Sequence, residues 1–194
     1  MSSRTWLLLT YKVPPEPARH RIAVWRKLKG MGVVYLQNGV CVLPLTDEYV
    51  RRLKVIENEI TNLGGDAVLL QSEGLDRAQE DKILARFHAE RDEAYTEVIS
   101  RCDDFEAELA RESAAGKFTY AEVEENEEDL RKLQTWIGKI VKLDFTGASL
   151  RVEAQTRVAR CETLLDEYAQ QVFKKQQAGG HDDADPTNRA KGPF

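Results

Sequence analysis

Apolar and polar residues follow a strand period at the start of the chain and then change to a helical period. Residues 6–13 alternate as in a β-strand, and Pro14 and Pro15 end the stretch. From residue 16 to residue 29 the apolar positions recur every three or four residues, which predicts an amphipathic helix. The predicted buried stripe of this helix consists of Ala18, Ile22, Trp25 and Leu28.

The residues that follow complete a βαββαβ pattern. Apolar runs at residues 33–36 and 40–43 flank Asn38-Gly39, a pair that suits a tight hairpin turn. A second amphipathic helix begins at Thr46 or Asp47 and ends before Gly64-Gly65, and a short apolar run at residues 66–72 predicts a fourth strand.

This order predicts a ferredoxin-like module over residues 1–75, within a protein of the α+β class. Both helices are expected on one face of the sheet. The side chains expected in the core between helices and sheet are Trp25, Leu28, Leu53 and Ile60.

Residues 76–177 have the pattern of three long amphipathic helices. Their apolar stripes run from Leu84 to Leu109, from Val123 to Ile140 and from Leu150 to Val172. Thr119 and Glu122 fit a capping box at the start of the middle helix. Short connections predict an antiparallel three-helix bundle, and residues 178–194, which lack apolar periodicity, are expected to be disordered.

Composition narrows the protein class. Of the 194 residues 42% are hydrophobic and 31% are charged, and no apolar run is long enough to span a membrane. No secretory signal is present, so a cytoplasmic location is expected. Cys41, Cys102 and Cys161 occupy apolar positions far apart in the sequence and are expected to be buried, reduced thiols.

Charge is divided unevenly along the chain. Residues 1–54 contain ten Lys and Arg and three Asp and Glu, whereas the remainder contains 18 and 30. One interpretation is that the basic part binds a polyanion and the acidic part does not. The other is that solvated helices simply differ in charge.

The sequence contains no recognisable catalytic motif. No His or Cys lies at metal-ligand spacing from another, and neither a phosphate-binding loop nor a nucleophile elbow is present. The acidic run at residues 122–129 alternates with the apolar stripe, which is typical of a solvated helix face rather than of catalytic carboxylates. We therefore expect no enzymatic activity, no cofactor and no metal.

The basic residues of the two predicted N-terminal helices have a coherent spacing. Arg19 and Arg26 are seven residues apart and share one side of the first helix, and further bases occupy the first turns of the second. Guanidinium and ammonium groups on one layer suit contacts to phosphates, which position a protein on nucleic acid without reading sequence. The candidate nucleic-acid-binding residues are Arg19, Arg26, Lys27, Arg51, Arg52 and Lys54.

Several stretches carry a family resemblance. TWLLLTYKVPPEPARHRIAVWRKLKGMGVVYLQNGVCVLP, DEYVRRLKVIENEI, GGDAVLL, AAGKFTYAEVEENEEDL and KLDFTGA resemble the N-terminal region of ChrB, the regulator of bacterial chromate-resistance operons. The resemblance covers about residues 4–175. The first module is also similar to the middle domain of PaaX-type repressors and, more distantly, to the small CRISPR-associated nuclease subunit that takes part in spacer acquisition.

The resemblance implies a transcriptional regulator of chromate resistance that binds double-stranded operator DNA. ChrB-type regulators usually carry a C-terminal domain to which the chromate response is attributed, and this chain is expected to lack it. Where the nuclease subunit has a metal-binding acid at the end of its first strand, this sequence has Lys12, so metal-dependent nuclease activity is not expected.

Two alternatives stay open beside DNA-binding regulation. In the first, the chain is an interaction module whose acidic bundle binds a partner, either a separately encoded ChrB C-terminal protein or a second copy of the chain. In the second, weaker alternative it is a degraded nuclease. No membrane partner is expected.

Overall fold

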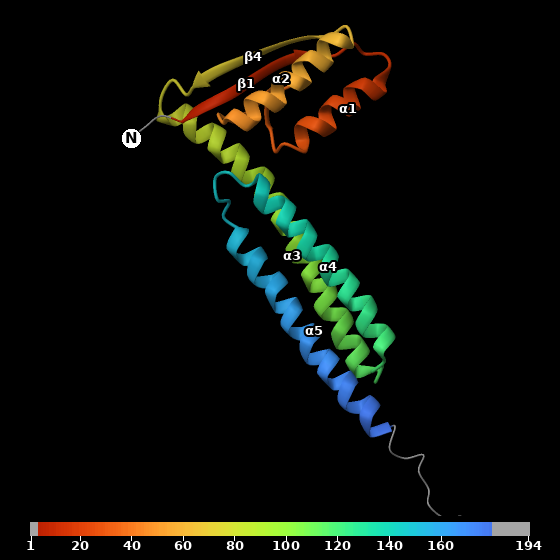
Figure 1. The fold of residues 1–194 in the computed structure, drawn as a ribbon. Coiled ribbons are helices and arrows are strands. Elements are labelled where there is room, and N and C mark those ends of the chain that lie inside the picture. Colours follow the sequence, from red (N-terminus) through yellow and green to blue (C-terminus); the bar gives the residue numbers. More distant parts are fainter. Residues whose placement is uncertain (1–3, 180–194) are drawn as a thin grey trace, which may run out of the picture. The chain divides into compact units, whose positions relative to one another are not determined.

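The structure is a computed structural model that describes residues 4–179. It has a four-stranded antiparallel sheet and five helices, which confirms the α+β class (Figure 1). Contacts divide the chain into two compact units. Of the described residues, the first unit contains 4–94 and 139–151, and the second contains 95–138 and 152–179. The predicted domain boundaries at residues 75 and 177 stay predictions.

The first unit contains the whole sheet and the first two helices. The strands lie in the order β2-β3-β1-β4, and every neighbouring pair is antiparallel. The elements are β1 (Thr5–Lys12), α1 (Ala18–Lys29), β2 (Val34–Gln37), β3 (Val40–Pro44), α2 (Asp47–Asn62) and β4 (Asp66–Glu73).

Local signals in the sequence explain where these elements begin and end. The predicted hairpin joins β2 to β3, and Gly39 adopts a φ of +73° at its turn. A Cβ atom at this position would lie 2.4 Å from the carbonyl oxygen of Tyr11, so only glycine fits there. Thr46 caps α2 by accepting a hydrogen bond from the amide of Tyr49 at 3.1 Å.

One face of the sheet packs against both α1 and α2, which lie side by side over it (Figure 1). Leu7, Leu9 and Leu43 of the strands contribute to this core. The prediction that Leu28, Leu53 and Ile60 are buried is confirmed, since each is at most 1% exposed.

The prediction for Trp25 was wrong. Its side chain is 50% exposed and that of Ile22 is 48% exposed, whereas Val24 and Leu28 are fully buried. The apolar residues of α1 at positions 22 to 25 and 28 spread over much of the helix circumference. Two different stripes, both containing Leu28, therefore fit a helical period. The sequence pattern favours the stripe with Ile22 and Trp25, whereas the helix buries the stripe with Val24.

The opposite face of the sheet is covered by the beginning of α3 (Arg77–Ala114). Trp6 of β1 stacks on Phe87 of α3 with 5.5 Å between the ring centroids, and Val34 and Val42 complete the cluster. Asp76 caps this helix by accepting a hydrogen bond from the amide of Gln79 at 2.9 Å. The first turns of α3 therefore belong with the sheet.

A loop distant in sequence also contributes to the first unit. Phe145 packs against both core clusters and makes edge contacts with the rings of Tyr49 and Phe87. Gly32 has a φ of +81°, and a Cβ there would lie 3.2 Å from Cβ of Leu143 and 3.3 Å from the Phe145 ring. The side chain of Asp144 holds the loop by accepting hydrogen bonds from the amides of residues 147 and 148.

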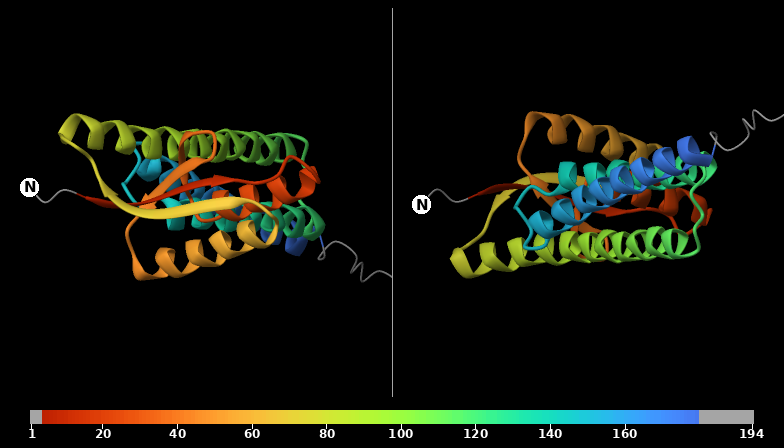
Figure 2. Two further views of the ribbon diagram at one scale, coloured as in Figure 1. Left: turned by 90° about the horizontal axis from the view of Figure 1, so that it is seen from above. Right: turned by 90° about the horizontal axis from the view of Figure 1, so that it is seen from below.

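The second unit consists of the rest of α3, most of α4 (Tyr120–Leu143) and most of α5 (Arg151–Gly179), which lie side by side (Figures 1 and 2). The predicted cap is present, since Thr119 accepts a hydrogen bond from the amide of Glu122 at 3.3 Å. Buried side chains of the three stripes form its interior: Val98, Phe105, Leu109, Leu130, Leu133, Ile137, Val158, Leu165 and Val172. The three predicted helices are thereby confirmed.

Two further expectations concern the chain ends and the membrane. The sequence predicts disorder for residues 178–194. From residue 180 onward, these positions lie outside the described residues. Between residues 4 and 179, no helix is long and apolar enough to cross a bilayer.

Candidate nucleic-acid interface

Helix α1 is basic along its whole length. Five of its 12 residues are Lys or Arg and none is acidic. The chain enters the helix at Pro17 and leaves it at Gly30. The last turn contains Arg26, Lys27 and Lys29, whose positive charges are stabilised by the negative end of the helix dipole. The helix buries Val24 and Leu28, so its cationic side chains point outward or lie at its flanks.

All six candidate residues are exposed, on the two helices that cover the same face of the sheet. Three lie on α1 and three on the first turns of α2: Arg19, Arg26, Lys27, Arg51, Arg52 and Lys54. Their role in nucleic-acid binding stays a prediction.

Two of the six side chains have acidic partners. Lys27 of α1 binds Glu59 of α2 with 2.6 Å between nitrogen and oxygen and so links the two helices. Arg52 lies 3.2 Å from Glu48, one turn earlier on α2, and also approaches the ring of Tyr49. These two positive charges are already partly neutralised within the protein.

The other four have no such partner. Within residues 4–179, Arg19, Arg26, Arg51 and Lys54 form no ion pair, and the same holds for Arg21. We call these five residues the unpaired α1–α2 cations. Like charges that are not neutralised inside the protein produce a positive potential that reaches about 10 Å into solution at moderate salt.

Sequence reasoning missed three exposed residues of α1, namely Arg21, Ile22 and Trp25. The two apolar residues were assigned to the core, and Arg21 was left out because it did not share the side of Arg19 and Arg26. The absence of any acid in α1 was the signal that could have included Arg21.

The end of β1 has a different chemistry. Lys12 is exposed and lies opposite Asp66 of β4 in the strand register. Among residues 4–179, no group of three or more His, Cys, Asp and Glu side chains is arranged to hold a metal ion. Lys12 adds positive charge at this end of the strand.

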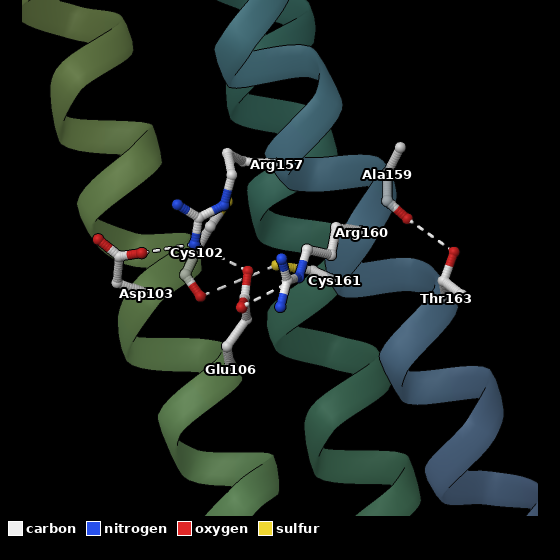
Figure 3. A network of polar contacts seen from close by, with 8 residues as sticks. All are labelled: Cys102, Asp103, Glu106, Arg157, Ala159, Arg160, Cys161 and Thr163. Atoms are coloured by element: carbon white, nitrogen blue, oxygen red, sulfur yellow. Dashed lines mark hydrogen bonds and ion pairs between the residues drawn. The ribbon is translucent and has the colours of Figure 1, made fainter.

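In the second unit, most basic side chains form ion pairs with acidic ones. Figure 3 shows Arg157 of α5 reaching Asp103 and Glu106 of α3, at 2.5 and 2.8 Å. Arg160 lies 3.3 Å from the same Glu106. An open groove of about 860 Å³ runs along α3 and α4, and its lining mixes acids, bases and the side chains of Phe105 and Trp136.

The bundle also contains a buried polar pair. Glu112 is 5% exposed and accepts a hydrogen bond of 2.8 Å from the side-chain amide of Asn126. Burial raises the pKa of Glu112 above its ordinary value, and a hydrogen bond with Glu122 raises it further.

The three cysteines are free and buried, as predicted. Burial raises the pKa of Cys41 to about 12 and that of Cys161 to about 12. In the second unit, Cys161 lies beside Cys102, with its sulfur 3.9 Å from the carbonyl oxygen of that residue (Figure 3). Thiols that stay protonated are poor nucleophiles and poor metal ligands.

Comparison with known proteins adds one decisive observation. A family model described as "Protein ChrB, N-terminal" matches residues 21–179, which is most of the chain. The chain belongs to the ChrB N-terminal family. The match contains most of α1 together with α2, the last three strands and the helical bundle. Neither curated proteins nor solved structures gave a significant match.

Proposed function

We propose that this member of the ChrB N-terminal family is a DNA-associated transcriptional regulator of chromate resistance. The observation that carries the proposal is the outward layer of α1 and α2, which bears five cations without an ion pair among residues 4–179 and, on α1, no acid. An unpaired arginine loses little when it binds a phosphate, because it gives up no existing ion pair. The partner that suits this layer is double-stranded DNA in the bacterial cytoplasm.

Contacts of this kind account for affinity rather than for sequence choice. Each phosphate contact releases counterions, so the affinity is expected to fall steeply as salt rises. Phosphate contacts fix where a protein lies on the duplex, whereas contacts to base edges select the site.

We also infer that residues 5–73 form a ferredoxin-like fold. The element order βαββαβ, the antiparallel strand order and the position of α1 and α2 on one sheet face support this assignment. We further propose that the protein is not an enzyme, and Lys12 at the end of β1 supports this for the nuclease reaction in particular.

The test is a titration of the purified protein against the DNA upstream of its own operon, at several salt concentrations and with and without chromate. We expect the logarithm of the binding constant to fall linearly with the logarithm of the salt concentration. Magnesium or manganese should not lead to cleavage of the DNA. Absence of salt-sensitive binding to any duplex would overturn the proposal.

A second candidate function rests on the groove along α3 and α4. Its lining combines the aromatic side chains of Phe105 and Trp136 with charged residues, a mixture that also occurs at protein-binding surfaces. Under this alternative the bundle binds a partner protein, such as a separate ChrB C-terminal protein or a second copy of the chain. Titration calorimetry with that C-terminal protein, compared between wild type and Trp136→Ala, distinguishes it from DNA binding.

A further inference from the structure

Helix α1 presents an apolar patch in the middle of its cationic surface. Trp25 and Ile22 are three residues apart, so their side chains are neighbours on the helix. Each exposes about half of its surface, 50% and 48%. Either stripe of α1 could pack on the sheet, yet the fold buries Val24 and leaves the larger Trp25 side chain half exposed.

Unpaired arginines surround this patch. Arg21 lies one helical turn before Trp25, and Arg19 and Arg26 lie one turn to either side of Ile22. Within the described part of the chain none of the three forms an ion pair. On α1, the charged neighbours of the patch are therefore all positive.

This frame favours nucleic acid over a protein as the ligand. Tryptophan and arginine also occur together at protein–protein interfaces, but a dense group of like charges would need an equally acidic partner surface. DNA offers the complementary combination, because a regular row of phosphates flanks sugars and bases with apolar faces. Tryptophan and isoleucine are among the side chains that contact such faces, by stacking or by wedging between base steps.

We propose that Trp25, together with Ile22, contacts the sugars and bases of the duplex whose phosphates are bound by Arg19, Arg21 and Arg26. The inference rests on the proposed DNA binding and adds a second component to it. Arginine contacts release counterions and depend on salt, whereas an apolar contact releases none. Trp25 thus supplies the part of the affinity that salt does not remove.

The two components can be separated by measuring how affinity depends on salt. Trp25→Ala and Trp25→Phe are compared with wild type on the upstream operon duplex, between about 50 and 200 mM salt. We expect Trp25→Ala to weaken binding about tenfold at every salt concentration, so that the line shifts and its slope stays the same. Trp25→Phe should recover most of the affinity, because a smaller aromatic ring can still stack.

Controls keep folding and non-specific effects apart from the contact. Phe173→Ala removes another half-exposed aromatic side chain, 53% exposed on α5 in the second unit, and should leave DNA binding unchanged. Far-UV circular dichroism and thermal unfolding check that the Trp25 variants fold as wild type does.

Three results would overturn the inference. One is wild-type affinity in Trp25→Ala while DNA binding by the wild type is salt-sensitive, which leaves the proposed function standing. Another is a dimer in analytical ultracentrifugation that dissociates in Trp25→Ala, since the patch would then join two copies of the chain. The third is wild-type protein that binds no duplex at all, and this result removes the proposed function as well.

Discussion

The two units of the molecule differ in how many of their basic side chains form ion pairs. In the second unit, Arg157 is shared by two carboxylates of α3, and Lys132 lies 2.8 Å from Asp129 on α4. In the first unit, Arg19, Arg26 and Arg51 extend from α1 and α2 with no carboxylate in reach among the described residues. Charge number alone would not reveal this contrast, because both regions are rich in arginine and lysine.

The contrast shows which charges are available to a ligand. An arginine held between two carboxylates adds to the stability of its own unit and would have to break those contacts to bind DNA. An unpaired arginine adds little to stability and keeps its donors free. The effects of substituting the two groups should therefore separate into binding and stability.

The largest effect is expected from reversing charge on the first helix. Arg19→Glu together with Arg26→Glu should weaken DNA binding about 10- to 100-fold at low salt and lower the salt slope by about two, because two phosphate contacts are lost. Fluorescence anisotropy with labelled operon DNA at several salt concentrations measures both quantities.

The acidic bundle provides the matched control for this double variant. Glu124 and Glu128 are exposed on α4, four residues apart, and reversing both to lysine should leave binding intact or raise it slightly. If the bundle variant abolished binding and the arginine variant did not, the DNA-binding surface would have to be assigned to the second unit instead of the first.

A smaller effect, on stability, is expected from the paired arginine. Arg157→Ala should lower the free energy of unfolding by about 1–2 kcal/mol, because Asp103 and Glu106 lose a shared donor at a partly buried position. Arg26→Ala should change it by less than about 0.5 kcal/mol, as is usual for an exposed side chain that forms no ion pair among the described residues. Urea denaturation of both variants measures the difference, and equal losses would remove the distinction between paired and unpaired charges.

The buried carboxyl of the bundle predicts a pH dependence of stability. The raised pKa of Glu112 means that the folded state holds a proton more tightly than the unfolded state. The free energy of unfolding should therefore fall as pH rises from 4.5, the ordinary pKa, through the raised folded value.

Glu112→Gln should remove this part of the pH dependence. Glutamine cannot ionise, and its carbonyl oxygen can still accept the hydrogen bond from Asn126. Urea denaturation at a series of pH values tests the variant against wild type. The same slope in both proteins would assign the titration to another group.

The smallest effect is expected at the cysteines, which should be unreactive in the folded state of both units. Because burial raises the pKa of Cys41 and Cys161 to about 12, neither should react with a thiol reagent in the folded protein at neutral pH. All three cysteines should react after unfolding, which calibrates the assay. Rapid labelling of the folded protein would show that one unit opens readily.

The sequence was sufficient for the elements and insufficient for some of their surfaces. Caps such as Thr46 and Thr119, and the turn at Gly39, act within a few residues, so local patterns located them correctly. The buried side of α1 depends on how the helix rolls on the sheet, and the apolar residues at positions 22 to 25 allow two answers. The exposure of Trp25 was therefore out of reach of periodicity.

The same limit applies to contacts between distant segments. The stripe of α3 includes Leu84 and Phe87, whose period does not reveal that they pack on the sheet while Phe105 packs within the bundle. For the candidate interface, the six cations named from the sequence are all exposed, but only coordinates separate the four without ion pairs from Lys27 and Arg52.

The position of Phe145 has a consequence for how the protein is made. On the ribosome, the sheet and its two helices emerge long before the loop that carries Phe145, and Gly32 stays uncovered until that loop arrives. The N-terminal core is therefore completed only when most of the bundle has been translated. Fragments cut after β4 would lack both Phe87 and Phe145, so a shortened version intended for DNA-binding experiments should extend at least to residue 151.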